Sequence, residues 1–223
     1  MHDSTSQRLM EMFENLLTHF GPQRWWPAET ELEMMVGAVL TQNTNWKNVE
    51  KALTNLKREN LLSLDKLSKL SHSEVAALIR PAGYFNIKAK RLKNLIDFIL
   101  EYYEADLSLF LKEKTQTLRE GLLSVKGIGP ETADSILLYA VRRPVFVVDA
   151  YTHRIMTRHG MTDDQVSYHE LQALFMDHLL EDTALFNEFH ALLVNTGKDY
   201  CRRRPLCHIC PLKAWGPSAP FSD

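Results

Sequence analysis

Helical periodicity runs through nearly the whole chain and is the strongest constraint on its fold. Apolar residues recur at spacings of three and four in about ten segments, such as MEMFENLLTHF near the N-terminus and AKRLKNLIDFILEYY further on. A single β-like run, PVFVV at 144–148, is too short to imply a sheet by itself. Glycine and proline stand at the joints between segments. The pattern therefore predicts an all-α fold with two lobes.

The composition excludes several classes of protein. Hydrophobic residues make up 45% and charged residues 24% of the 223 residues, as in an ordinary globular protein with a core. The net charge is −2, so contacts with nucleic acid must come from local basic patches. No apolar run reaches the roughly 18 residues that a membrane span needs. The N-terminus has no signal-peptide pattern. We expect a cytoplasmic, bacterial-type protein that is a monomer and does not enter membranes.

A tight glycine turn joins two of the helical segments. Lys126, Gly127, Ile128 and Gly129 lie between TLREGLLSV and TADSILLYAV, and Thr132 opens the second segment. Glycine permits positive φ angles and close approach of another backbone. The N–H groups and the positive dipole at the start of the second helix suit a phosphate. The simpler interpretation is a helix-to-helix turn with a glycine cap.

An aspartate follows the PVFVV run and precedes the helical segment AYTHRIMTRHG. Asp149 is therefore well placed to cap the N-terminus of that helix, because its carboxylate can accept hydrogen bonds from the first N–H groups.

Together these motifs resemble a known family. LSVKGIGPETADSILLYA followed by VFVVDAYTHRI resembles the helix-hairpin-helix and Gly/Pro–Asp signature of the endonuclease III superfamily of DNA glycosylases. VGAVLTQNTNWKNVEKAL, IRPAGYFNIKAKRLKNL and FHALLVNTGKDYCRRRPLCHICPL extend the resemblance in order over roughly residues 20 to 215.

This resemblance implies two all-α lobes with a DNA cleft between them. One lobe would comprise residues 29–142 and carry the hairpin, and the other would join 1–28 to 143–223, with a cysteine loop at 201–216. It also implies base-excision repair on double-stranded DNA with damaged bases, in the cytoplasm at the nucleoid.

The family pattern assigns Asp149 as the catalytic carboxylate. Cleavage of an N-glycosidic bond gives the deoxyribose oxocarbenium character, which a nearby anion stabilises while it orients water. Bifunctional members carry a lysine two residues after the second hairpin glycine, and that amine forms a Schiff base with the sugar. This chain has Glu131 there. We therefore expect a monofunctional enzyme that uses water as the nucleophile.

A second stretch indicates which base is removed. WWPAETELEMMVGAVLTQNTNW resembles the 3-methyladenine DNA glycosylase subgroup, which implies a pocket lined by Trp25, Trp26, Pro27 and Trp46. Aromatic faces can hold a flipped base and attract a cationic purine. The alternative is that the tryptophans fill a core. Gln42 matches the residue that fills the gap left by the flipped base, although it could be a plain surface glutamine.

Three cysteines lie within ten residues, at Cys201, Cys207 and Cys210. The resemblance implies a [4Fe–4S] cluster held by four thiolates, but Gly216 stands where the fourth cysteine would be. The fourth ligand would then be exogenous or a histidine, and His208 is close by. A Cys₃His zinc site and a loop of free thiols stay open as alternatives. Catalysis would need none of these cofactors.

Local basic clusters are the remaining signal for DNA. One cluster lies on a single helical segment, and clusters of this kind are usually solvated faces. Two others flank the aspartate and the cysteine loop, where we expect contacts with phosphate. The clusters are Lys88, Lys90, Arg91 and Lys93; Arg142, Arg143, Arg154 and Arg158; and Arg202, Arg203 and Arg204.

Three functions are consistent with the sequence. The leading hypothesis is a monofunctional glycosylase for alkylated purines such as 3-methyladenine. The second is a mismatch thymine or uracil glycosylase of the same fold. The third is a helix-hairpin-helix DNA-binding module without catalysis, which would bind DNA equally well after Asp149→Asn.

Overall fold

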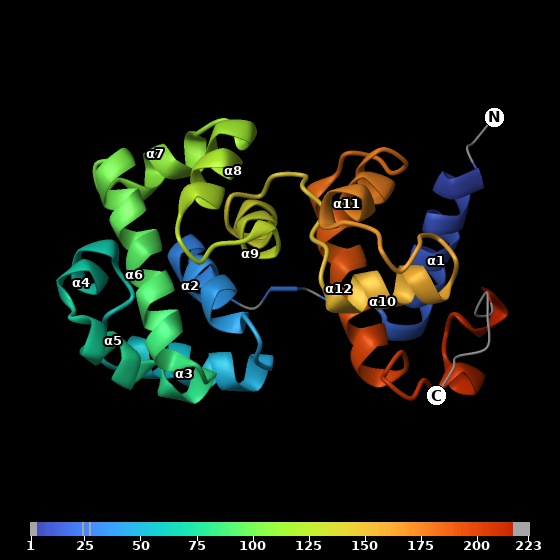
Figure 1. Ribbon diagram of the computed structural model, residues 1–223, viewed down its shortest axis with the longest axis horizontal. Helices are drawn as coiled ribbons and strands as arrows, with labels where there is room; N and C mark the ends of the chain where they lie inside the picture. Colours follow the sequence, from blue (N-terminus) through green and yellow to red (C-terminus); the bar gives the residue numbers. More distant parts are fainter. Residues whose placement is uncertain (1–3, 24, 27, 216–223) are drawn as a thin grey trace. The chain divides into compact units, whose positions relative to one another are not determined.

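The fold is helical, as the sequence predicted. The computed structural model describes residues 4–23, 25–26 and 28–215, and within these ranges all regular structure is helical (Figure 1). Pro27 and Gly216 lie outside the described residues. Among the helices described, none is long and apolar enough to cross a membrane. The PVFVV run is an irregular, extended segment that is buried.

The chain divides into two compact units. Unit 1 joins Met1–Trp25 to Pro144–Asp223, and unit 2 is Trp26–Arg143. The helices of unit 1 are α1 (Ser4–Phe20), α10 (Ala150–Arg158), α11 (Tyr168–Met176), α12 (Thr183–Asp199), η3 (Cys207–Ile209) and η4 (Lys213–Trp215). Those of unit 2 are α2 (Glu31–Thr41), α3 (Trp46–Arg58), α4 (Leu64–Lys69), α5 (His72–Leu78), η1 (Arg80–Ala82), α6 (Phe85–Tyr102), α7 (Leu107–Lys112), α8 (Thr115–Ser124), α9 (Pro130–Ser135) and the π-helix η2 (Ile136–Ala140).

Unit 2 is built around α2, which packs against α3, α6 and η2. Thr30 caps α2 by accepting a hydrogen bond from the Glu33 N–H. The Glu33 side chain is buried, and its Oε1 lies 2.7 Å from Lys57 Nζ. The ion pair compensates a carboxylate that would otherwise be costly to bury.

A lysine of α6 is also part of the unit 2 core. Lys88 is 1% exposed, and its Nζ donates to the carbonyl oxygens of Leu40 at 2.8 Å and Ala82 at 2.7 Å. Burial, with a smaller contribution from Arg91, lowers its pKa to about 8. Lys88 therefore ties the ends of α2 and η1 to α6, and it does not belong to a solvated basic face.

The core of unit 1 is rich in phenylalanine and holds the PVFVV segment in place. Phe146 stacks on Phe175 with ring centroids 3.8 Å apart and packs edge-on against Phe186 and Phe189. Val147 and Val148 are buried as well. This anchored segment leads directly into α10, so it fixes the position of Asp149 at the start of that helix.

Helices α10 and α12 lie against each other in unit 1. Gly197 of α12 makes the close approach possible, because a Cβ added there would lie 2.3 Å from Cδ1 of Tyr151 on α10. This contact sets how the side chains of α12 lie beside the N-terminus of α10.

Candidate functional site

The glycine hairpin lies in unit 2 between α8 and α9. Gly127 has a φ of 100°, and a Cβ there would lie 2.4 Å from Cγ of Arg91. Both the positive φ angle and the lack of room for a Cβ atom thus require glycine at this position. Ile128 is buried and anchors the turn, whereas Lys126 and Gly129 are exposed. The hairpin therefore presents its backbone and one cationic side chain to solvent, and its contact with phosphate stays a prediction.

Gln42 is bound to the hairpin. Its Nε2 donates to the Gly127 carbonyl at 3.1 Å and to Thr132 Oγ1 at 2.9 Å, and Arg91 donates to its Oε1. The Thr132 side chain is buried and holds Gln42, and the predicted contact of Thr132 with phosphate stays a prediction. Gln42 must leave these partners before it could fill a gap in DNA.

Asp149 is the N-cap of α10. Its Oδ1 accepts hydrogen bonds from Thr152 N at 2.7 Å and Thr152 Oγ1 at 2.9 Å. Its Oδ2 lies 3.8 Å from Nε2 of His190, and the side chain is 12% exposed. Capping thus fixes one carboxylate oxygen, and the other is directed away from the cap. The sequence predicted this cap correctly.

Two residues of α12 shape the electrostatics around Asp149, and sequence reasoning missed both. Burial lowers the pKa of His190, although the nearby Asp149 opposes that shift. His190 is therefore neutral near pH 7. Burial also lowers the pKa of Lys198, with Asp149 again opposing. Their segment, FHALLVNTGKDY, shows ordinary helical spacing, so no local signal marked either residue.

The aromatic residues predicted to line a base pocket fall into two sets. In unit 2, the rings of Trp26 and Trp46 meet edge-on at 4.8 Å, and Tyr139 lies 5.1 Å from Trp26. In unit 1, Nζ of Lys198 lies 5.3 Å from the Trp25 ring centroid. Tyr139 is buried, so it supports the Trp26 ring from the core.

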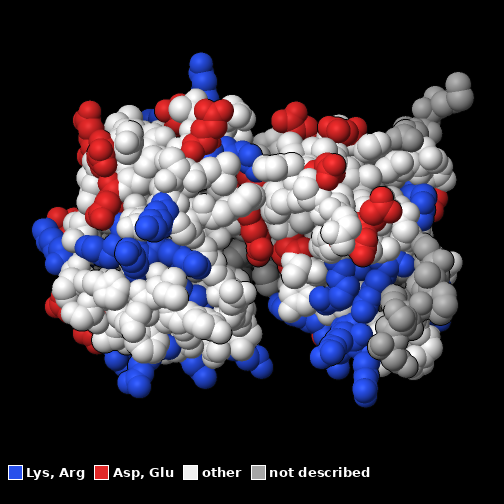
Figure 2. Space-filling model, in the orientation of Figure 1, with Lys and Arg blue, Asp and Glu red and all other residues white. Residues whose placement is uncertain are grey.

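Several arginines expected to contact phosphate form hydrogen bonds within unit 1. Arg154 donates to the carbonyl oxygens of Cys201 at 2.6 Å and Gly197 at 3.2 Å. Arg158 donates to the Arg202 carbonyl at 2.7 Å. These two side chains hold the cysteine loop against α10, and their contact with phosphate stays a prediction. Arg202, Arg203 and Arg204 are exposed, and Lys and Arg side chains gather in this region (Figure 2).

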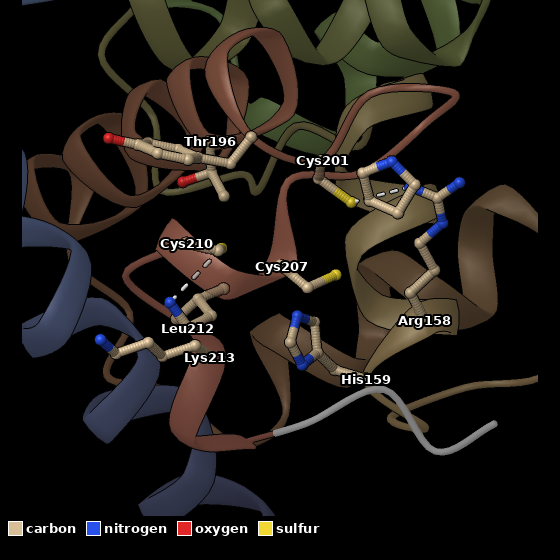
Figure 3. A pocket seen from close by; sticks show the side chains of 10 residues that line it. Arg158, His159, Thr196, Cys201, Cys207, Cys210, Leu212 and Lys213 are labelled. Carbon is tan, nitrogen blue, oxygen red and sulfur yellow. Dashed lines mark hydrogen bonds between the residues drawn. The ribbon is translucent and has the colours of Figure 1, made fainter. Parts of the chain in front are cut away.

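The three cysteines line one cavity of about 30 Å³ in unit 1, which we call the cysteine pocket (Figure 3). Its other lining residues are Arg158, His159, Thr196, Tyr200, Pro205, Leu212 and Lys213. Burial raises the pKa of the Cys210 thiol, and the nearby Cys201 and Cys207 raise it further.

The donors in this pocket fit an iron–sulfur cluster. Arg158 Nη1 donates to Cys201 Sγ at 3.3 Å, and Leu212 N donates to Cys210 Sγ at 3.4 Å. Such N–H···S contacts tune clusters in proteins. Across the described residues, no group of three or more His, Cys, Asp or Glu side chains is placed to hold a metal ion. The arrangement thus disfavours a single zinc ion but not a cluster, because each thiolate of a cluster binds a different iron.

Glu131 lies in the first turn of α9 and is exposed. The family resemblance implies a Schiff-base lysine at this position in bifunctional members. A glutamate there suits the positive end of the helix dipole and has no nucleophilic amine.

A helix-hairpin-helix, a buried extended segment and a helix-capping aspartate together define the helix-hairpin-helix class of DNA glycosylases. The chain belongs to the HhH-GPD superfamily of base excision DNA repair proteins, whose profile it matches over residues 36–179. It is a DNA glycosylase of base excision repair with an endonuclease III-like fold.

Three relatives illustrate this membership. The chain is 46% identical over 214 residues to MJ1434 of Methanocaldococcus jannaschii, named as a DNA repair glycosylase, with 96% of this chain and 97% of the relative covered. It is 33% identical to 3-methyladenine DNA glycosylase MagIII of H. pylori, solved with 1,N6-ethenoadenine, at a TM-score of 0.75 with 87% and 97% covered. An endonuclease III–DNA complex, 19% identical, shares the fold at a TM-score of 0.80 with 95% and 94% covered.

Proposed function

We propose that this protein is a monofunctional DNA glycosylase that hydrolyses the N-glycosidic bond of alkylated purines such as 3-methyladenine. The observation that carries the proposal is the geometry of Asp149. Thr152 fixes its Oδ1, while Oδ2 lies outside the cap on a side chain that retains 12% exposure. A carboxylate held in this way is preorganised to act on a developing positive charge.

In the proposed reaction, the bond between C1′ and the base nitrogen breaks and its electron pair leaves with the base. Asp149 stabilises the positive charge that develops on the sugar. Water then adds to C1′, and Asp149 Oδ2 accepts its proton. His190 supports this step by remaining neutral, since an imidazolium 3.8 Å from Oδ2 would offset the negative charge that the sugar needs.

Aromatic side chains support the assignment to purines. Trp26 and Trp46 of unit 2 are both partly exposed and pack beside the buried Tyr139, and their rings offer flat surfaces for a base. An alkylated purine carries positive charge, so it gains cation–π attraction and is a good leaving group without a general acid. The 33% identity to MagIII, a 3-methyladenine DNA glycosylase by name, is consistent with this substrate class.

Glu131 supports hydrolysis without strand cleavage. Its carboxylate cannot form the imine that a lyase needs. The product would then be an abasic site in an intact strand. The cysteine pocket takes no part in this chemistry; a cluster bound by Cys201, Cys207 and Cys210 would be a structural group, because glycosidic cleavage has no redox step.

The test is base release from alkylated DNA. Purified protein and Asp149→Asn are incubated with methylated DNA, and free bases are separated by chromatography. We expect the parent to release 3-methyladenine, the variant to release little, and strands to break only after alkali. Borohydride should trap no covalent complex with the parent.

Other results would contradict the proposal in distinguishable ways. Excision restricted to mismatched thymine or uracil would identify the mismatch glycosylase. DNA binding without release of any base, unchanged by Asp149→Asn, would identify a binding module. A borohydride-trapped complex with the parent would show a lyase.

A further inference from the structure

The cysteine pocket contains a histidine that the sequence did not associate with it. His159 is the C-cap of α10, 42 residues before Cys201, and its imidazole lines the pocket beside Cys207 (Figure 3). We propose that His159 is the fourth protein ligand of a [4Fe–4S] cluster held by Cys201, Cys207 and Cys210, in place of the cysteine that the chain lacks at Gly216.

The size and the lining of the cysteine pocket both suit a bound group. A cavity of about 30 Å³ is roughly twice what one water needs, so it is larger than a packing defect. Three thiols and one imidazole line this cavity, so it brings together the sulfur and nitrogen donors that bind iron.

The charges around the pocket suit bound thiolates. Arg158 already donates to Cys201 Sγ, and Lys213 lines the same cavity. Two cations beside three sulfurs offset the negative charge of a thiolate-ligated cluster. The Leu212 N–H adds a hydrogen bond to Cys210 Sγ, so two of the three sulfurs already have N–H donors.

His159 is better placed to be the fourth ligand than His208, the histidine within the cysteine loop. His208 directly follows Cys207, is exposed, and is not among the residues that line the pocket. His159 comes from a different element, which supplies a ligand from another direction, as a cluster with one ligand on each iron requires. Imidazole nitrogen binds iron in the Rieske type of [2Fe–2S] cluster, so it is a chemically competent replacement for a thiolate.

Cluster content tests this proposal without reference to base release. The parent, His159→Ala and the matched control His208→Ala are purified without oxygen and reconstituted with iron and sulfide. Iron, acid-labile sulfide, zinc, visible absorption and electron paramagnetic resonance are then measured. We expect the parent and His208→Ala to bind a [4Fe–4S] cluster, and His159→Ala to lose iron to a chelator about 10-fold faster or more.

A rescue variant separates loss of a ligand from loss of folding. His159→Cys supplies a fourth thiolate at the same place, so it should retain the cluster at least as well as the parent. Circular dichroism should show equal helix content in all variants. The proposal is overturned if the reconstituted parent holds no iron, if it holds zinc instead, or if His159→Ala and His208→Ala release iron equally fast.

Discussion

Gly197→Ala should destabilise unit 1, because the added methyl group has no room between α12 and α10. Its Cβ would lie 2.3 Å from Cδ1, 2.6 Å from Cγ and 2.7 Å from Cβ of Tyr151. Carbon atoms in contact normally lie about 3.5–4.0 Å apart. Rotation of the tyrosine ring cannot relieve the clash, since one of the three atoms is Cβ, which is fixed to the backbone of α10.

The expected magnitude follows from two opposing contributions. Overpacking in a filled core costs about 1–3 kcal/mol, and a clash with an atom next to the backbone belongs at the upper end. Alanine regains about 1 kcal/mol over glycine inside a helix. The free energy of unfolding should therefore fall by about 2 kcal/mol, which corresponds to a fall in Tm of about 4–8 °C for a chain of this size.

Urea unfolding followed by circular dichroism measures this change. Gly37→Ala is the matched control, because it also lies within a helix but its Cβ would meet the Trp26 ring at 3.4 Å, an ordinary contact. We expect that control to be neutral or slightly stabilising. If the free energy of unfolding of Gly197→Ala lies within about 0.5 kcal/mol of the parent value, the close approach of α10 and α12 does not limit the stability of unit 1.

Three further predictions concern single side chains. Asp149→Asn should keep the helix cap, because asparagine caps equally well, yet lower base release by about 10²–10³-fold; thermal unfolding and chromatography separate the two effects. Burial lowers the pKa of His190, so near pH 6.5 the unfolded chain binds a proton that the folded chain does not. The free energy of unfolding should therefore fall as the pH drops below about 6.5. In urea titrations, His190→Asn should make that fall smaller. Lys88→Met should lower the free energy of unfolding by about 1–3 kcal/mol, because two carbonyls lose their donor, whereas Lys90→Met on the exposed side of α6 should change it little in the same assay.

The local sequence pattern was sufficient to predict the features that depend on residues close together in the sequence. The spacing of apolar residues predicted the helices because burial of one helix face imposes it. Asp149 could be identified as a cap because the run before it and the helix after it are both visible in sequence. Gly127 could be identified as a turn residue, although its close approach to Arg91 could not.

The missed features depend on contacts between segments far apart in the chain. Lys88 lies in a run of basic residues, and nothing local shows that it points inward to Leu40 and Ala82. His190 acquires its importance because α12 packs against α10. Arg154 and Arg158 were assigned to phosphate because charge alone does not reveal the carbonyl oxygens that they bind.

Helix α10 begins directly after Asp149 and ends directly before His159. Each residue added to an α-helix turns everything beyond it by about 100° and advances it by about 1.5 Å. One inserted residue would therefore keep Asp149 in place and swing the imidazole away from the three thiols, or the reverse. The proposed roles of Asp149 and His159 thus place two constraints on the length of this helix, and homologous chains that keep both ends should show substitutions within α10 but no insertions or deletions.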